Sequence, residues 1–234
     1  PTAVINASLY GVVYEALMQK DQIGTVYGMI NGIEGFLADT IMDMNSVEQS
    51  GELELIKTTP GSFLGSCRYK LPEDLKDDVY PLLFKKFEEY SIGYFFYIGN
   101  DSMDTVSKLS RYAAISGSEI CFIGIPKTID NDLVLTDHTP GFGSAAKYVA
   151  SMVREVAIDA SVYDNKKSVT IVEIMGRHAG WLTAASALAR KYDGDNPRLI
   201  YLPETAFDQE AFLKKVQKMC EGFIENTTMA VHTS

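Results

Sequence analysis

The sequence predicts an α/β protein built on parallel β-sheets. Two observations carry this prediction. Continuous apolar runs at 93–98 and 119–125 are typical of strands buried on both faces of a parallel sheet. Segments with apolar residues at helical spacing alternate with such runs along the chain. This alternation implies parallel strands that are covered by helices on both faces.

The first half of the chain shows the alternation clearly. Apolar residues at helical spacing predict helices at 4–18 and 71–90, and a short strand is expected near 25–29. Residues 32–60 show no readable period. The strand at 93–98 is followed by a helix at 102–116, which Gly117 is expected to end, and by the strand at 119–125.

The same pattern continues after an irregular stretch at 126–140, which is the best candidate for a domain boundary. The expected elements are listed in chain order: a long helix at 143–162, a strand at 168–174, an Ala-rich helix at 178–190, a strand at 198–202, a helix at 208–225 and the start of a strand at 228–234. The chain opens on Pro1 without an initiator Met, so we expect it to be a fragment.

Composition excludes several classes of function. The chain has 234 residues with 21 Lys+Arg and 31 Asp+Glu, a formal net charge of −10, which argues against binding to nucleic acid or to an anionic membrane surface. No apolar run reaches membrane-spanning length and no signal peptide is visible. Cys67, Cys121 and Cys220 are odd in number and widely spaced, which predicts a reducing, cytoplasmic setting without a disulfide framework or a zinc knuckle.

Ligands of open α/β sheets bind beyond the carboxyl ends of the strands, so the residues after each strand are the candidates for chemistry. Gly99-Asn100-Asp101-Ser102 follows one strand and opens a helix, a place that favours an anion. Asp101 stands where a phosphate is expected, and the alternative is that Asp101 and Asp104 cap the helix. No P-loop motif occurs in the sequence.

The segment after the next strand, Pro126-Lys127-Thr128-Ile129-Asp130-Asn131-Asp132, is dense in polar groups. One of its carboxylates can accept a proton from a hydroxyl and the other can hold Mg²⁺. Lys127 can neutralise a phosphoryl group. The alternative is a solvated turn rich in Asp and Asn.

Three further segments are weak signals alone. In Met175-Gly176-Arg177, glycine permits close approach of a ligand and arginine can fork onto a phosphate. Arg68 lies in a Gly-Ser loop and Glu204 follows a predicted strand. Each can equally be an ordinary turn or surface residue.

In this order, however, the segments resemble the 6-phosphofructokinase family, and specifically its pyrophosphate-dependent branch. The matching stretches cover nearly the whole chain: 1–8, 61–68, 99–102, 124–132, 141–147, 172–180 and 202–204. The resemblance implies two Rossmann-like three-layer α/β/α domains with mostly parallel sheets. Residues 1–138 would bind the phosphoryl donor and 139–234 would bind fructose 6-phosphate, both domains being incomplete.

The resemblance also implies the reaction, a glycolytic phosphoryl transfer to the 1-hydroxyl of fructose 6-phosphate. Asp130 matches the general base, with Asp132 beside it, and Lys127, Asp101 and Arg177 complete the catalytic set. The resemblance implies that the sugar phosphate is contacted by Thr128, Ile129, Asp130, Met175, Gly176, Arg177 and Glu204. It implies that the donor phosphates are contacted by Arg68, Gly99, Asn100, Asp101, Ser102 and Lys127.

The donor is predicted from two positions. ATP-using relatives carry glycine at the positions of Asp101 and Lys127. A carboxylate at Asp101 adds bulk and like charge where the α-phosphate of ATP lies, so it excludes ATP. The Lys127 cation replaces stabilisation that a nucleotide draws from remote contacts. Both changes predict pyrophosphate.

One departure from the family pattern concerns the metal. Asn100 replaces a carboxylate associated with Mg²⁺ in the family, so Asn100 and Asp101 form a weaker predicted metal site. The alternatives to a pyrophosphate-dependent enzyme are an ATP-dependent 6-phosphofructokinase and a catalytically silent subunit that binds sugar phosphate. The family implies a homo-oligomer, a dimer or a tetramer, and we expect this 234-residue chain alone to be inactive.

Overall fold

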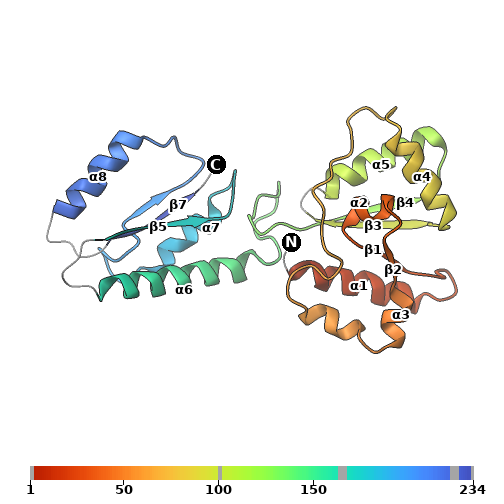
Figure 1. Ribbon diagram of the computed structural model, residues 1–234, viewed down its shortest axis with the longest axis horizontal. Coiled ribbons are helices and arrows are strands. Elements are labelled where there is room, and N and C mark those ends of the chain that lie inside the picture. Colours follow the sequence, from red (N-terminus) through yellow and green to blue (C-terminus); the bar gives the residue numbers. More distant parts are fainter. Residues whose placement is uncertain (1–2, 100–101, 163–167, 222–226, 233–234) are drawn as a thin grey trace. The chain divides into compact units, whose positions relative to one another are not determined.

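The computed structural model describes residues 3–99, 102–162, 168–221 and 227–232. The chain divides into two units, Pro1–Lys127 and Thr128–Ser234. Each unit combines helices with a parallel sheet (Figure 1), so the predicted α/β class is confirmed. The division lies after Lys127, whereas the sequence predicts it after residue 138. Residues 128–138 join the second unit, where Ile129 packs against the core cluster that contains Ile174 and Asn131 accepts a hydrogen bond from the Thr139 backbone N–H.

The first unit contains a two-stranded parallel sheet and a two-stranded antiparallel sheet among its described elements. In chain order these elements are α1 (Val4–Met18), β1 (Tyr27–Met29), α2 (Gly32–Leu37), β2 (Ile41–Asp43), α3 (Met44–Gln49), the 3₁₀ helix η1 (Leu53–Thr58), α4 (Val79–Glu89), β3 (Tyr94–Gly99), α5 (Ser102–Ser116) and β4 (Cys121–Pro126). β3 pairs in parallel with β4, and β1 pairs antiparallel with β2.

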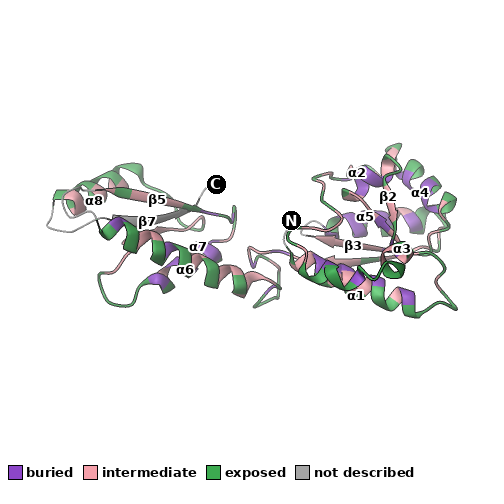
Figure 2. Ribbon diagram, turned by 60° about the horizontal axis from the view of Figure 1, so that its bottom comes forward, coloured by how far each residue is buried: buried purple, intermediate pink, exposed green. Residues whose placement is uncertain are grey.

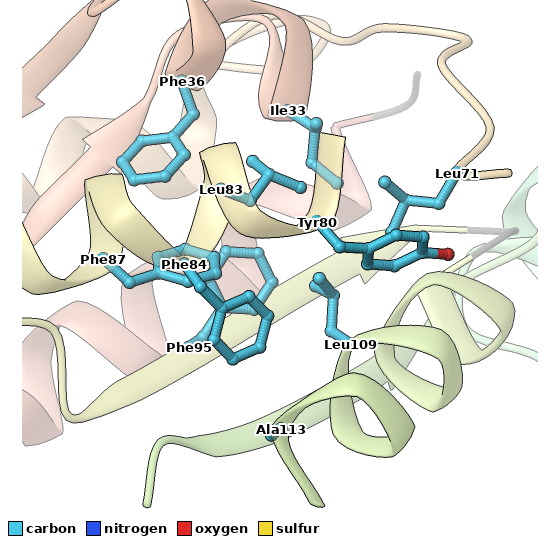
Figure 3. Packing of buried hydrophobic residues seen from close by; sticks show 10 residues of the cluster. All are labelled: Ile33, Phe36, Leu71, Tyr80, Leu83, Phe84, Phe87, Phe95, Leu109 and Ala113. Atoms are coloured by element: carbon cyan, nitrogen blue, oxygen red, sulfur yellow. The ribbon is translucent and has the colours of Figure 1, made fainter. Parts of the chain in front are cut away.

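Both faces of the β3–β4 sheet carry helices, as the apolar runs predict. Phe95 points to the core cluster that also contains Phe87 of α4 and Leu109 of α5. Figure 3 shows this cluster, to which α2 adds two further side chains. Ile98 points to the opposite face, since side chains alternate along a strand, and it packs against the second cluster, around Val13 of α1.

The second unit contains a three-stranded parallel sheet in the order β5-β7-β6. In chain order its described elements are α6 (Phe142–Ser161), β5 (Val169–Ile174), α7 (Trp181–Ala185), the 3₁₀ helix η2 (Ser186–Ala189), β6 (Leu199–Tyr201), α8 (Gln209–Glu221) and β7 (Thr227–His232). A small core of Val153, Ile174, Leu182 and Ala189 joins α6 and α7 to β5.

Two predicted helices differ from the structure. The helix expected at 71–90 begins only at Val79, because Asp77 accepts a hydrogen bond from the Val79 backbone N–H at 2.9 Å and so ends the preceding turn. The Ala-rich helix expected at 178–190 is shorter and continues as a 3₁₀ turn from Ser186, whose hydroxyl donates to the Thr183 carbonyl.

In the described part of the chain, no helix combines the length and the apolar character that crossing a membrane requires. Several helices, among them α1, α4 and α5, carry buried residues (Figure 2).

Candidate active site

The ends of β3 and β4 are joined by a buried serine. The Ser102 hydroxyl lies within hydrogen-bond distance of two strand-end carbonyl oxygens, 2.8 Å from Gly99 O and 3.3 Å from Ile125 O. The Lys127 backbone N–H donates to the Gly99 carbonyl at 3.2 Å. Gly99, Ser102 and Lys127, three predicted donor residues, are therefore brought together at the carboxyl edge of the sheet. Asn100 and Asp101 lie outside the described residues.

Arg68 lies on an irregular loop that contacts the rest of the first unit at two places, Leu64 and Cys67. Upstream, the Asn31 backbone N–H donates to Leu64 O at 2.8 Å. Next to Arg68, the Cys67 Sγ lies 3.8 Å from the Tyr97 hydroxyl of β3. The Arg68 side chain is exposed. The loop thus holds a cation at the surface beside the strand that leads to Gly99.

Further upstream, Asn6 of α1 anchors the same loop. Its buried side-chain amide donates to Thr59 O and Gly61 O and accepts from the Phe63 backbone N–H, each at 2.8 Å. Sequence reasoning assigned no role to Asn6, because its three partners lie more than fifty residues away along the chain.

Asp104, in the first turn of α5, is engaged by a buried lysine. Its Oδ2 accepts a hydrogen bond from Lys108 Nζ at 2.8 Å. Asp104 therefore forms an ion pair with Lys108. The spacing of four residues is the sequence signal that could have indicated this pair. Hydrogen bonds from Lys108 to Asp104, and secondly to Glu73, raise the pKa of the Lys108 ammonium above its ordinary value.

In the second unit, the candidate general base follows a buried threonine. Thr128 is almost fully buried, and its hydroxyl accepts the Asp130 backbone N–H at 3.1 Å. Ile129 packs against the cluster that contains Ile174, the last residue of β5. Since Met175-Gly176-Arg177 continues directly from Ile174, the two candidate sugar-phosphate segments are neighbours in this unit.

The turn after Asp130 is shaped by Asn131, another residue to which sequence reasoning gave no role. Asn131 adopts a left-handed backbone conformation, with φ of 58°, which asparagine tolerates better than most residues. Its amide donates to Asp137 O at 3.1 Å and accepts from the Thr139 backbone N–H at 2.8 Å. These bonds hold the chain around Asp130, and Asp132 points to solvent.

The Met175–Arg177 segment and Glu204 have geometry suited to a ligand. Gly176 has a φ of 135°, a conformation in which a side chain is strained, and both Met175 and Arg177 are exposed. Glu204 Oε1 accepts the backbone N–H of Gly180 at 2.8 Å, just before α7. Glu204 thereby ties the segment after β6 to the turn that carries Arg177.

The predicted site residues are divided between the two units. Arg68, Gly99, Ser102 and Lys127 belong to the first, and the second holds the remaining described ones: Thr128, Ile129, Asp130, Asp132, Met175, Gly176, Arg177 and Glu204. Within the described ranges, no group of three or more His, Cys, Asp or Glu side chains could hold a metal ion.

The described residues thus form two α/β units, each with candidate phosphate-binding groups at the ends of its strands. A family model described as "Phosphofructokinase" matches residues 1–232. The chain belongs to the phosphofructokinase family.

Relatives within the family narrow the comparison. The chain is 48% identical over 223 residues to the pyrophosphate--fructose 6-phosphate 1-phosphotransferase of Xanthomonas campestris, covering 94% of this chain and 52% of that protein. It is 31% identical to an ATP-dependent 6-phosphofructokinase of Glaesserella parasuis, covering 97% of this chain and 63% of the relative. The crystal structure of a pyrophosphate-dependent phosphofructokinase from Marinobacter aquaeolei matches with a TM-score of 0.84 at 43% identity, covering 98% of this chain and 57% of that one.

The predicted resemblance to the pyrophosphate-dependent branch is thus confirmed. The chain spans about half the length of the pyrophosphate-dependent curated relatives that it matches.

Proposed function

We propose that the protein containing this chain transfers a phosphoryl group from pyrophosphate to the 1-hydroxyl of fructose 6-phosphate, giving fructose 1,6-bisphosphate. The observation that carries the choice of donor is the hydrogen bond between Lys127 N and Gly99 O. This bond places the Lys127 backbone beside Gly99, and an ammonium at this edge of the sheet would stabilise a short inorganic donor. Names of relatives at 43–48% identity support the same donor and acceptor.

The roles of the residues follow from the charge that develops in phosphoryl transfer. Asp130 accepts the proton of the sugar hydroxyl, so that the oxygen can attack phosphorus. Lys127, Arg68 and Arg177 neutralise charge on the phosphoryl oxygens, and this positioning and neutralisation make up most of the catalysis. Asp132, Thr128, Ile129, Met175, Gly176 and Glu204 complete the sugar-phosphate contacts.

The first unit, which ends at Lys127, is proposed to bind the donor, and the second unit, which begins at Thr128, is proposed to bind fructose 6-phosphate. Each unit has its own group of candidate residues at strand ends, which supports this division. We further propose a cytoplasmic, glycolytic enzyme that works as a homo-oligomer, and we expect the 234-residue chain alone to be inactive.

Mg²⁺ is the proposed cofactor, and the chemistry of the candidate ligands fits it. Asn100 and Asp101 supply amide and carboxylate oxygens, the hard donors that Mg²⁺ prefers, while Asp104 in the next turn is occupied by Lys108. Asn100 and Asp101 would hold the ion. Bound there, Mg²⁺ neutralises charge on the donor phosphates.

A direct comparison of donors tests the proposal. The full-length protein encoded by the gene is assayed with fructose 6-phosphate and either pyrophosphate or ATP, coupled to the appearance of fructose 1,6-bisphosphate. We expect turnover with pyrophosphate and little with ATP. Turnover with ATP alone would favour the ATP-dependent alternative, and turnover with neither donor the silent sugar-phosphate-binding subunit.

Two variants separate the donor argument from the reaction itself. Replacing Asp101 and Lys127 together by glycine should lower turnover with pyrophosphate, because the cation beside the donor is lost, and should admit ATP by removing bulk and charge. Asp130→Asn should reduce turnover with either donor by a factor of about 10² to 10⁴, the usual contribution of a general base. Unchanged turnover after Asp130→Asn would remove the proton-transfer role.

A further inference from the structure

Lys108 of α5 is a buried cation that the reaction proposed above does not use. Its side chain is only 5% exposed. The ammonium group lies 2.6 Å from Glu73 Oε1, 2.8 Å from Asp104 Oδ2 and 3.0 Å from the Leu71 carbonyl oxygen. A lysine ammonium has three N–H donors, so this set of acceptors is complete.

The three acceptors belong to the two segments that carry the donor residues. Leu71 and Glu73 lie in the stretch that follows Arg68. Asp104 lies in the first turn of α5, which begins at Ser102, immediately after Asn100 and Asp101. Lys108 thus joins both segments through one buried charge, and both lie within the first unit.

Neighbouring contacts make this junction rigid. The Tyr80 hydroxyl of α4 donates to the Pro72 carbonyl at 2.5 Å, and Leu71 is buried in the same cluster as Tyr80 and Leu109. Figure 3 shows Leu71 and Tyr80 close together in that cluster, with Leu109 of α5 in the same core. Each of residues 71–73 therefore has a contact that fixes it: Lys108 binds Leu71 and Glu73, and Tyr80 binds the residue between them.

We propose that Lys108 is a positioning residue, which fixes Arg68 relative to Ser102 at the start of α5 and thereby controls affinity for the donor phosphates. This inference rests on the proposed function, because Arg68 and the 99–102 segment are taken as donor contacts. Two groups that bind one pyrophosphate from separate segments of the chain need a fixed distance between them, because small displacements of binding groups lower the reaction rate by large factors. The ion pairs keep the Lys108 ammonium charged, which strengthens all three bonds.

The first test compares two buried lysines in the full-length protein. Lys108→Met should raise the KM for pyrophosphate roughly 10-fold or more, while the KM for fructose 6-phosphate changes less than about twofold. Lys86→Met is the matched control, because Lys86 is similarly buried but pairs with Asp39, outside both donor segments. It should leave both KM values near those of the parent, even if it lowers stability. An equal effect of the two variants on the pyrophosphate KM would overturn the proposal.

A milder variant guards against loss of folding. Glu73 is 84% exposed, so Glu73→Gln removes one charge of the junction without leaving a buried gap. It should raise the pyrophosphate KM in the same direction as Lys108→Met, by a smaller factor. No change in either KM would count against a role of the junction in donor binding.

A double-mutant cycle then asks whether Lys108 acts through Arg68. If it does, Lys108→Met combined with Arg68→Ala should bind pyrophosphate about as weakly as Arg68→Ala alone. Fully additive losses would contradict the inference. Measuring pyrophosphate binding by calorimetry keeps this test separate from the reaction: a parent protein that binds pyrophosphate but transfers nothing refutes the proposed function and leaves the positioning role testable.

Discussion

The buried amide of Asn6 is the clearest case of a single residue that shapes the site from a distance. It satisfies three backbone groups of the loop that leads to Arg68. Asn6→Leu leaves all three groups without this partner. Since each lost bond costs about 1 kcal/mol and buried unpaired groups cost more, the free energy of unfolding should fall by roughly 3 kcal/mol.

Urea denaturation of the 234-residue chain measures this loss. Ser50→Ala is the control, because it removes the hydroxyl of an exposed residue that donates to a carbonyl oxygen three residues away along the chain. That variant should change stability by less than about 0.5 kcal/mol. Equal losses in the two variants would show that Asn6 does not anchor the loop.

The ion pair of Asp39 with Lys86 predicts a dependence of stability on pH. The hydrogen bond from Lys86 holds the pKa of the Asp39 carboxyl below its ordinary value. An acid whose pKa is lowered by folding adds stability above its unfolded pKa of about 3.9, and that stability is lost as the pH falls through the lower, folded pKa. The contribution is therefore complete near pH 6 and disappears in the acid range below about pH 4.

Asp39→Asn isolates this contribution. Asp39 has a φ of 57°, and asparagine accepts that left-handed conformation, so the backbone should be unchanged. Urea midpoints of the parent and the variant should differ near pH 6 and converge as the pH is lowered toward 2. A constant difference over this whole range would exclude the pair as the cause.

At the scale of helices, two glycines predict opposite effects of the same substitution. A Cβ added to Gly11, in the middle of α1, meets no atom within 4 Å. Gly11→Ala should stabilise the chain by about 1 kcal/mol, since glycine is a poor helix former. A Cβ on Gly35 of α2 would lie 1.5 Å from the Ile30 carbonyl oxygen, so Gly35→Ala should destabilise by about 2 kcal/mol or more.

Melting temperatures of the two variants, measured by circular dichroism, test this pair. The midpoint should rise for Gly11→Ala and fall for Gly35→Ala. A fall in both would mean that α1 needs the freedom of Gly11 for a reason other than helix formation.

These elements also mark how far sequence reasoning reaches. The apolar runs of β3 and β4 and the period of α5 are local signals, and they predict these elements nearly to their observed ends. Within residues 32–60, by contrast, α2, β2 and α3 are only three to six residues long. Such short elements depend on tertiary contacts, such as the complete burial of Met44, because a helix this short cannot repay its own nucleation.

The same distinction applies to the candidate site. Motifs identify Thr128, Asp130 and Arg177, because each stands just after a strand in a recognisable order. Lys108 belongs to no such motif, and sequence reasoning gave Asn131 no role. Spacing alone indicates the pair of Lys108 with Asp104, whereas the Lys108 partners Leu71 and Glu73 are distant along the chain and become neighbours only in the folded protein. Asp101 carries the donor prediction from sequence alone and lies outside the described residues.

At the scale of the whole molecule, the two units differ in how well their sheets are covered. In the first unit, buried side chains from α1, α2, α4 and α5 pack on β3 and its neighbours in two clusters. In the second, Val169 and Ile171 on one face of β5 are 41% and 59% exposed, and none of the described residues of α8 is buried. Less apolar burial means that local opening of the second unit costs less free energy.

Hydrogen exchange of the 234-residue chain should therefore rank the two sheets. Amides of β3 and β4 should exchange more slowly than amides of β5 and β6, because exchange from paired strands requires opening against the burial that holds them. Mass spectrometry of peptides that cover 94–99 and 121–126, against 169–174 and 199–201, makes the comparison within one sample. Equal protection would mean that the units open together, and slower exchange in β5 would mean that its exposed face is covered in solution.

Adding pyrophosphate gives the internal check: it should slow exchange at 102–106 and 127 in the first unit more than at 169–174, as expected if the donor binds at the ends of β3 and β4.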